Sequence, residues 1–210
     1  MKQKLIINAD DYGMSPRFNT GIIYMINHKI VSSTTVMINE KYIDAQELLK
    51  NKSISVGLHI NVTEENCEKE TEKQIKKFEK IFGTLPSHMD GHKHCHLRPY
   101  TLHETIKCAK KYAIPLRSRF VEDRKIIQKN NVATPDHYIS WHPIRFAKLY
   151  RNLQENDAPI TELVSHPGYF DKNCSYPYNR EREEEMSILQ KPEIQDLIIS
   201  KYELISYDQL

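Results

Sequence analysis

The sequence Leu5-Ile6-Ile7-Asn8-Ala9-Asp10-Asp11 joins a short apolar run to two adjacent carboxylates. The apolar part predicts a buried strand over Leu5–Asn8, because such runs are typical of strands covered on both faces. Asn19–His28 follows, with isoleucines spaced for one side of a helix. A buried strand followed by an amphipathic helix is the first half of a βαβ unit, so we expect a parallel sheet.

The same alternation of strand and helix continues along the chain. Further strands are expected over Ser33–Ile38, Ile54–Val62, Asp90–His96, Leu116–Ser118, Ile160–Ser165 and Leu204–Tyr207. Further helices are expected over Tyr42–Asn51, Glu68–Phe82, Thr101–Tyr112, Pro143–Asn156, Glu181–Leu189 and Pro192–Lys201. The polar stretch Val121–Asp136 predicts an irregular active-site loop or small excursion. Together these elements predict an α/β fold, a distorted (β/α) barrel in a single domain over residues 1–210, with an open doubly wound sheet as the alternative.

Composition and charge limit the kinds of partner that the chain is expected to bind. A length of 210 residues with 39% hydrophobic residues is enough to bury a substantial core. The net charge of +2 gives no electrostatic case for binding nucleic acid. The apolar run near the N-terminus is too short for a signal peptide or a membrane span, so we expect a cytoplasmic protein with no membrane partner. Four cysteines without a CxxC pair predict free thiols.

Polar side chains stand at the predicted ends of four strands. They are the Asp10-Asp11 pair, His59, the run from Asp90 to His96, and His166. Because the active site of a barrel forms at the carboxyl ends of its strands, we expect these groups to meet in space. His166 could pass protons near neutral pH, which suits a general acid for an amine leaving group.

The run Asp90-Gly91-His92-Lys93-His94-Cys95-His96 carries one carboxylate and three imidazoles in seven residues. In an extended segment His92, His94 and His96 would share one face and could converge on one metal ion or substrate. This run is therefore the first candidate for a metal site.

Each of these positions also has a plainer alternative. Asp10-Asp11 could form a turn or a helix cap, and His59 alone could be an ordinary core histidine. The segment Trp141-His142-Pro143 is interpreted as structural or as an edge of the substrate site. Arg182 and Glu185, three residues apart on a helix, could form an ion pair that either braces the site or lies on the surface.

The chain resembles the YdjC-like family of carbohydrate deacetylases in motifs that run in order along almost the whole sequence. These motifs are Asn8–Gly13, Ser32–Thr35 with Asn39, Gly57–His59, Asp90–His96, Glu162–Gly168, Arg182 with Glu185 and Leu189, and Ile205–Asp208. The resemblance implies a distorted (β/α) barrel and a divalent metal ion, zinc or magnesium, held by one aspartate and two histidines.

Carried over to this sequence, the resemblance makes Asp11, His59 and His92 the metal ligands. Asp10 then resembles the family's general base, and His166 resembles its general acid. His94 and His96 are left as supporting or substrate-contacting residues, with His96 expected to be the more exposed.

The activity that the resemblance implies is hydrolysis of the N-acetyl group of an amino sugar or short oligosaccharide, with release of acetate. It also implies a small carbohydrate as the partner and a homodimer. A short segment between His59 and Asp90 predicts an open substrate pocket. Two alternatives remain open: a metal-dependent phosphoesterase, for which Arg98, Arg117 and Arg119 would supply positive charge, and a catalytically silent sugar-binding protein.

Overall fold

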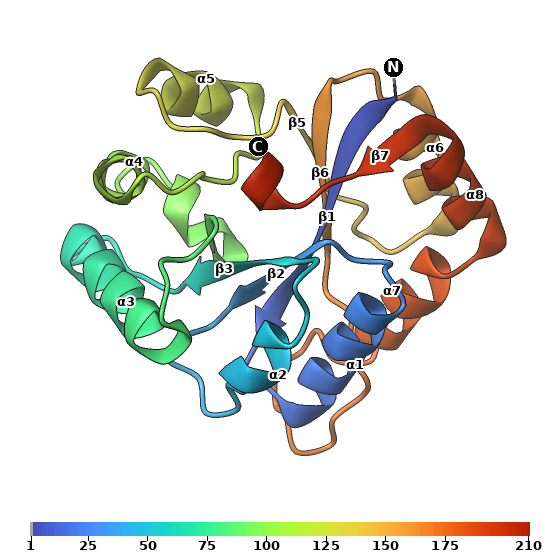
Figure 1. Ribbon diagram of the computed structural model, residues 1–210, viewed down its shortest axis with the longest axis horizontal. Coiled ribbons are helices and arrows are strands. Elements are labelled where there is room, and N and C mark those ends of the chain that lie inside the picture. Colours follow the sequence, from blue (N-terminus) through green and yellow to red (C-terminus); the bar gives the residue numbers. More distant parts are fainter. Residues whose placement is uncertain (1) are drawn as a thin grey trace.

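Seven parallel strands form one sheet in the computed structural model, which describes residues 2–210. Along the sheet the order is β4-β3-β2-β1-β6-β5, and β7 pairs with the beginning of β1. The strands are β1 Gln3–Tyr12, β2 Ser33–Val36, β3 Ser55–Ile60, β4 Met89–Gly91, β5 His137–Ile139, β6 Ile160–Ser165 and β7 Tyr202–Leu204. The strands are all parallel with helices around them (Figure 1), which confirms the predicted (β/α) barrel in a single domain, and the barrel is distorted because the sheet stays open between β4 and β5.

Helices surround the strands, as Figure 1 shows. They are α1 Pro16–Asn27, α2 Ala45–Leu49, α3 Cys67–Phe82, α4 Leu102–Tyr112, α5 Val121–Lys129, α6 Phe146–Glu155, α7 Glu181–Leu189 and α8 Pro192–Lys201. Two short 3-10 turns, η1 His92–Leu97 and η2 Tyr207–Gln209, complete the described chain. The hydroxyl of Ser15 accepts a hydrogen bond from the backbone N–H of Arg17 and caps α1, and Gly83 ends α3 in a left-handed conformation.

The central strand β1 divides the interior of the protein into two layers. Leu5 and Ile7 belong to the main hydrophobic core, whereas Ile6 packs with Ile205 and Tyr207. Because side chains alternate along a strand, Asn8 and Asp10 lie on the same side as Ile6. One end of the barrel interior is therefore apolar, and its other end, at the carboxyl ends of the strands, is polar.

Outside the histidine run, three predicted segments differ from the structure. Val121–Asp136 contains the regular helix α5, which the carboxylate of Asp123 starts by accepting the backbone N–H groups of Arg119 and Phe120. The strand expected over Leu116–Ser118 is a single bridge between Leu116 and Met89. The closing strand lies earlier than expected, at β7, and Tyr207 instead begins η2.

Candidate metal centre and active site

A bulge at the end of β1 directs two adjacent carboxylates toward the same cleft. The register against β2 shifts between Ala9 and Tyr12, and Asp11 has a φ of 73°. In a regular strand Asp10 and Asp11 would point to opposite faces, but the left-handed residue brings both to the wall of the cleft. Aspartate tolerates this backbone conformation better than most residues, so the pair is compatible with the bulge.

Asp11, His59 and His92 meet at the carboxyl end of the sheet. Asp11 Oδ1 lies 3.3 Å from His59 Nε2 and 3.2 Å from His92 Nδ1, and one donor atom of each residue lies within 4.8 Å of the others. Donors that share one zinc ion in tetrahedral geometry are about 3.3 Å apart. The spacing and chemistry of this group fit a divalent ion, and the role of the three residues as ligands stays a prediction.

The orientation of His59 supports the same interpretation. Its Nδ1 lies 2.6 Å from Asp90 Oδ1, and a carboxylate on one ring nitrogen leaves the other nitrogen available to a metal. Burial alone would lower the pKa of His59, but Asp90 and Asp10 raise it well above the usual range. Carboxylates that attract a proton to this ring would also attract a divalent cation.

Arg117 holds Asp10 from inside the barrel. The fully buried guanidinium donates to both oxygens of Asp10 at 2.8 Å and lies 2.6 Å from Asp90 Oδ2, and its Nε donates to Glu162 at 2.9 Å. Burial raises the pKa of Asp10, but Arg117 outweighs burial and holds it well below the usual range. Asp10 is therefore ionised and fixed in position.

His166 lies on the opposite side of Asp10, at the end of β6. Its Nε2 is 3.9 Å from Asp10 Oδ2, and its Nδ1 is 3.4 Å from Oε1 of the buried Glu185. Glu185 also accepts the backbone N–H of His166 at 2.6 Å and the hydroxyl of Tyr178. Burial lowers the pKa of His166, but Glu185 raises it by more, so the pKa lies above its usual value. The protonated form of the ring is favoured, which is the form that a general acid needs.

The histidine run does not form the extended face that its spacing predicts. Only Met89–Gly91 is strand, and Lys93 and His94 adopt left-handed conformations within η1. His92 reaches Asp11, whereas His94 lies in the cleft, where burial lowers its pKa to about 3. His96 is fully buried with its Nε2 3.2 Å from the backbone oxygen of Arg117, so the expectation that it is the more exposed of the two is wrong.

Arg182 and Glu185 are buried, and the structure separates their roles. Arg182 Nη2 donates to Asp11 Oδ2 at 2.5 Å, while Glu185 holds His166. The alternative of an ion pair on the surface is therefore wrong. Both residues brace the site, but each does so through its own partner and not through the other. Sequence reasoning named Arg117 only as positive charge for a phosphate and His142 only as structural or an edge of the substrate site, and it did not place Arg117 on Asp10 or His142 beside Glu185. The sequence signal for the buried position of Arg117 is its place beside the apolar Leu116 in a short strand-like segment.

One cleft of about 190 Å³ contains all five predicted site residues, together with Tyr138, His142 and Tyr176. A neighbouring hollow of about 490 Å³ shares His92 and Tyr176 with the cleft. The space available to a ligand therefore continues beyond the two carboxylates.

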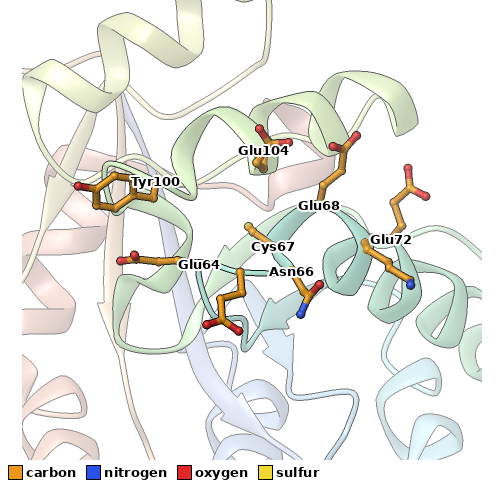
Figure 2. A pocket seen from close by; sticks show the side chains of 9 residues that line it. Glu64, Asn66, Cys67, Glu68, Glu72, Tyr100 and Glu104 are labelled. Carbon is orange, nitrogen blue, oxygen red and sulfur yellow. The ribbon is translucent and has the colours of Figure 1, made fainter.

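A larger cleft, of about 530 Å³, lies at the beginnings of α3 and α4. Figure 2 shows its labelled glutamates spread along the cleft rather than gathered at one point. Glu72 pairs with Lys111, and Glu68 and Glu104 share Lys107, so lysines partly neutralise the acidic side chains of this cleft. No histidine lines this cleft among the residues that the structure describes, and it is not a candidate for the same chemistry.

Between residues 2 and 210, no helix is both long enough and apolar enough to cross a membrane.

Known proteins resemble this chain over nearly its full length. A family model described as YdjC-like protein matches residues 4–68 and 63–200. A carbohydrate deacetylase of Brevibacillus brevis is 27% identical in an alignment that covers 99% of both chains. A chitooligosaccharide deacetylase of Yersinia enterocolitica is 29% identical, and the alignment covers 94% of this chain and 95% of the relative.

Two solved structures share the fold. A protein of Enterococcus faecalis V583 with a proposed role in cellobiose-phosphate cleavage superposes with a TM-score of 0.87 at 25% identity, covering 100% of this chain and 99% of the other. A family 4 acetyl xylan esterase of Clostridium thermocellum, solved with a cobalt ion, gives a TM-score of 0.60 at 12% identity, covering 99% and 89%. The second comparison supports the fold alone.

Proposed function

The chain belongs to the YdjC-like protein family, and from this premise we propose that it is a metal-dependent carbohydrate deacetylase. Its substrate is an N-acetylated amino sugar or a short chitooligosaccharide-like chain, which it hydrolyses to acetate and a free amine. The observation that carries the proposal is the convergence of Asp10, Asp11, His59, His92 and His166 on one cleft. The deacetylase domain spans residues 1–210.

Asp11, His59 and His92 are the residues that would hold the metal ion. One carboxylate and two imidazoles suit zinc, and the family resemblance also admits magnesium, although magnesium prefers oxygen ligands. When bound, a divalent ion of this kind acidifies water and polarises the acetyl carbonyl. Arg182 fixes the second oxygen of Asp11 and leaves Oδ1 directed toward the two histidines.

Asp10 is the general base of the proposed reaction. A carboxylate with a lowered pKa is a weak base, so it accepts protons only from a water molecule that is already acidic. Arg117 compensates by holding Asp10 ionised and aimed into the cleft at every pH near neutrality.

His166 is the general acid, and Glu185 keeps it protonated. The ring nitrogen Nε2 faces Asp10 across the cleft, on the side where the amine of the sugar would leave. Donation from this nitrogen to the departing amine completes the cleavage of the C–N bond. The negative charge of the Glu185 carboxylate, 3.4 Å from Nδ1, stabilises the charged ring before that transfer.

The phosphoesterase alternative needs free positive charge for a phosphate group. Arg117 does not supply it, because Asp10, Asp90 and Glu162 surround a guanidinium that is fully buried. Of the arginines that suggested this alternative, only Arg119 lines the cleft. The deacetylase proposal therefore gives a role to more of the residues in the cleft than the phosphoesterase alternative does.

The test is release of acetate from diacetylchitobiose and N-acetylglucosamine by protein stripped with a chelator and then reloaded with zinc or magnesium. We expect activity to return with the metal, and Asp10→Asn and His166→Asn each to lower kcat about 10²–10⁴-fold, the usual contribution of a general acid or base. The exposed His103→Gln is the matched control and should retain activity. Metal-independent acetate release, or full activity in both site variants, would contradict the proposal. The catalytically silent alternative predicts no release from any of these sugars.

Two finer expectations belong to the same proposal. The homodimer implied by the resemblance is checked by sedimentation velocity of the purified protein. The cytoplasmic location is checked by fractionation of cells that produce the untagged chain.

A further inference from the structure

A second group of metal-ligating side chains lies beside the proposed acid. His142 follows β5, His166 ends β6, and Glu185 belongs to α7. One donor atom from each residue lies within 4.8 Å of the others. Glu185 Oε1 is 3.5 Å from His142 Nε2 and 3.4 Å from His166 Nδ1.

These distances are similar to those among Asp11, His59 and His92, which we call the Asp11 group. Hydrogen bonds do not account for the short distances in the second group. His142 Nε2 and His166 Nδ1 are both buried and lack a hydrogen-bond partner, although a carboxylate oxygen lies close to each. Each nitrogen therefore meets Oε1 of Glu185 off the axis that a hydrogen bond requires. A buried nitrogen without a hydrogen-bond partner is unfavourable, so the arrangement of this group needs another explanation.

Tyr178 decides which nitrogen of His142 carries the lone pair. The hydroxyl of Tyr178 has one proton, and it donates that proton to Glu185. The contact of 3.2 Å between this hydroxyl and His142 Nδ1 must then use a proton on the histidine. In the tautomer with its proton on Nδ1, the ring carries a lone pair on Nε2. A lone pair thus faces a carboxylate oxygen, and two acceptors in contact repel each other unless a cation lies between them.

We propose that His142, His166 and Glu185 form a second divalent-cation site, with the ligand chemistry of zinc. Two imidazole nitrogens and a carboxylate oxygen about 3.3 Å apart are the donors that a tetrahedral zinc ion takes, with a further position open toward the cleft. The acidic cleft at α3 and α4 offers no imidazole nitrogen among its described lining residues.

Occupation of this second site inhibits the enzyme, a consequence that rests on the proposed function. An ion on His166 Nδ1 takes the place of the proton that Glu185 stabilises. The ring can then no longer alternate between the charged and neutral forms that proton transfer to the leaving amine requires. Zinc is therefore an activator at the Asp11 group and an inhibitor at the His142 group.

The binding part is tested without substrate, by titrating chelator-stripped protein with zinc in a calorimeter and with Co²⁺ in a visible-absorption spectrometer. The expected result is two bound ions for the wild type and for the control His103→Gln. Asp11→Asn and His142→Gln should each bind one ion, and the double variant should bind none. His142 has 34% of its side chain exposed, so its replacement is compatible with folding. Tyr178→Phe, which keeps all three donors, should weaken the second ion by at least about tenfold through loss of the supporting hydroxyl.

The inhibition part compares each variant with its own activity at one equivalent of zinc. The wild type should lose activity as zinc rises further, and His142→Gln should need at least about ten times more zinc for the same fractional loss. A wild type that binds a single ion would overturn the proposal. So would a second ion that survives His142→Gln but disappears in Glu68→Gln, because that ion would occupy the acidic cleft. If no substrate is deacetylated, the proposed function fails, while the Co²⁺ titration still decides the second site.

Discussion

Replacing Arg117 by methionine would remove the guanidinium that lies among three buried carboxylates at the centre of the barrel. The guanidinium contacts Asp10, Asp90 and Glu162 at distances between 2.6 and 2.9 Å, and none of these four side chains is exposed by more than 4%. Breaking a buried pair by removing one partner typically lowers stability by about 3–5 kcal/mol. For a chain of this size that corresponds to a fall in Tm of roughly 6–20 °C.

The pH dependence of this loss follows from the pKa of Asp10. In the wild type the folded pKa lies below the unfolded value of about 3.9, so the pair stabilises the protein at higher pH and this contribution fades as pH falls through the folded pKa. In Arg117→Met the main influence that opposes burial is lost, and His59 and His166 are the groups that still lower the pKa of Asp10, so this pKa rises. The difference from wild type therefore shrinks as pH falls through the raised pKa, and it is greatest near neutrality.

Urea denaturation of both proteins between pH 5 and pH 8, in the presence of chelator, measures this difference directly. The control is Lys107→Met, which removes an exposed cation from a surface pair and should leave the midpoint unchanged. A difference between Arg117→Met and wild type below about 1 kcal/mol at pH 7 would refute the account, since a buried charge left unpaired costs several times that amount. A difference that stays constant across this pH range would refute the assignment of Asp10 as the responding group.

Three further predictions concern packing, proton transfer and metal binding. Gly57→Ala should lower the free energy of unfolding by about 1–3 kcal/mol, measured by urea denaturation, because the added Cβ would lie 2.4 Å from the ring of the buried His88. Glu185→Gln should move the basic limb of the kcat/KM profile to lower pH, since burial lowers the pKa of His166 and the Glu185 carboxylate is what raises it; an unmoved limb would count against His166 as the acid. Chelation of bound divalent ions should lower Tm by roughly 5–11 °C when the free ion had been near 100 times its Kd, as seen by differential scanning calorimetry, and an unchanged Tm would show that no ion stabilises the fold.

Most of the fold could be predicted from the sequence because its signals are local. Ile160–Ser165, Glu181–Leu189 and Pro192–Lys201 have the same bounds in the structure as in the prediction. Ile160–Ser165 lies between Pro159 and Pro167, and Pro192 stands at the first position of its helix, so local signals mark these ends. The prediction failed at α5 and β5, where few side chains are fully buried and packing against the rest of the barrel determines the conformation.

The grouping of the site residues could also be predicted, because the carboxyl ends of parallel strands meet at one end of the barrel. The supporting charges could not. Arg117 and Glu162 lie 45 residues apart, and sequence alone does not indicate that both reach the same buried carboxylate network. The partners of Arg182 and Glu185 illustrate the same difficulty, because helical spacing suggested that they pair with each other whereas tertiary packing gives each a different partner.

The run from Asp90 to His96 shows why spacing was a poor guide to its own geometry. A Cβ on Gly91 would lie 2.7 Å from the ring of His96, so the glycine allows the chain to fold back tightly where the strand ends. The left-handed residues that follow then send the three histidines in different directions: His92 toward Asp11, His94 into the cleft and His96 beneath Arg117. Asp90 itself orients His59. The four polar residues of this run, which the spacing suggested would form one metal-binding motif, thus lie at four different places. Of its histidines, only His92 belongs to the group that contains Asp11 and His59.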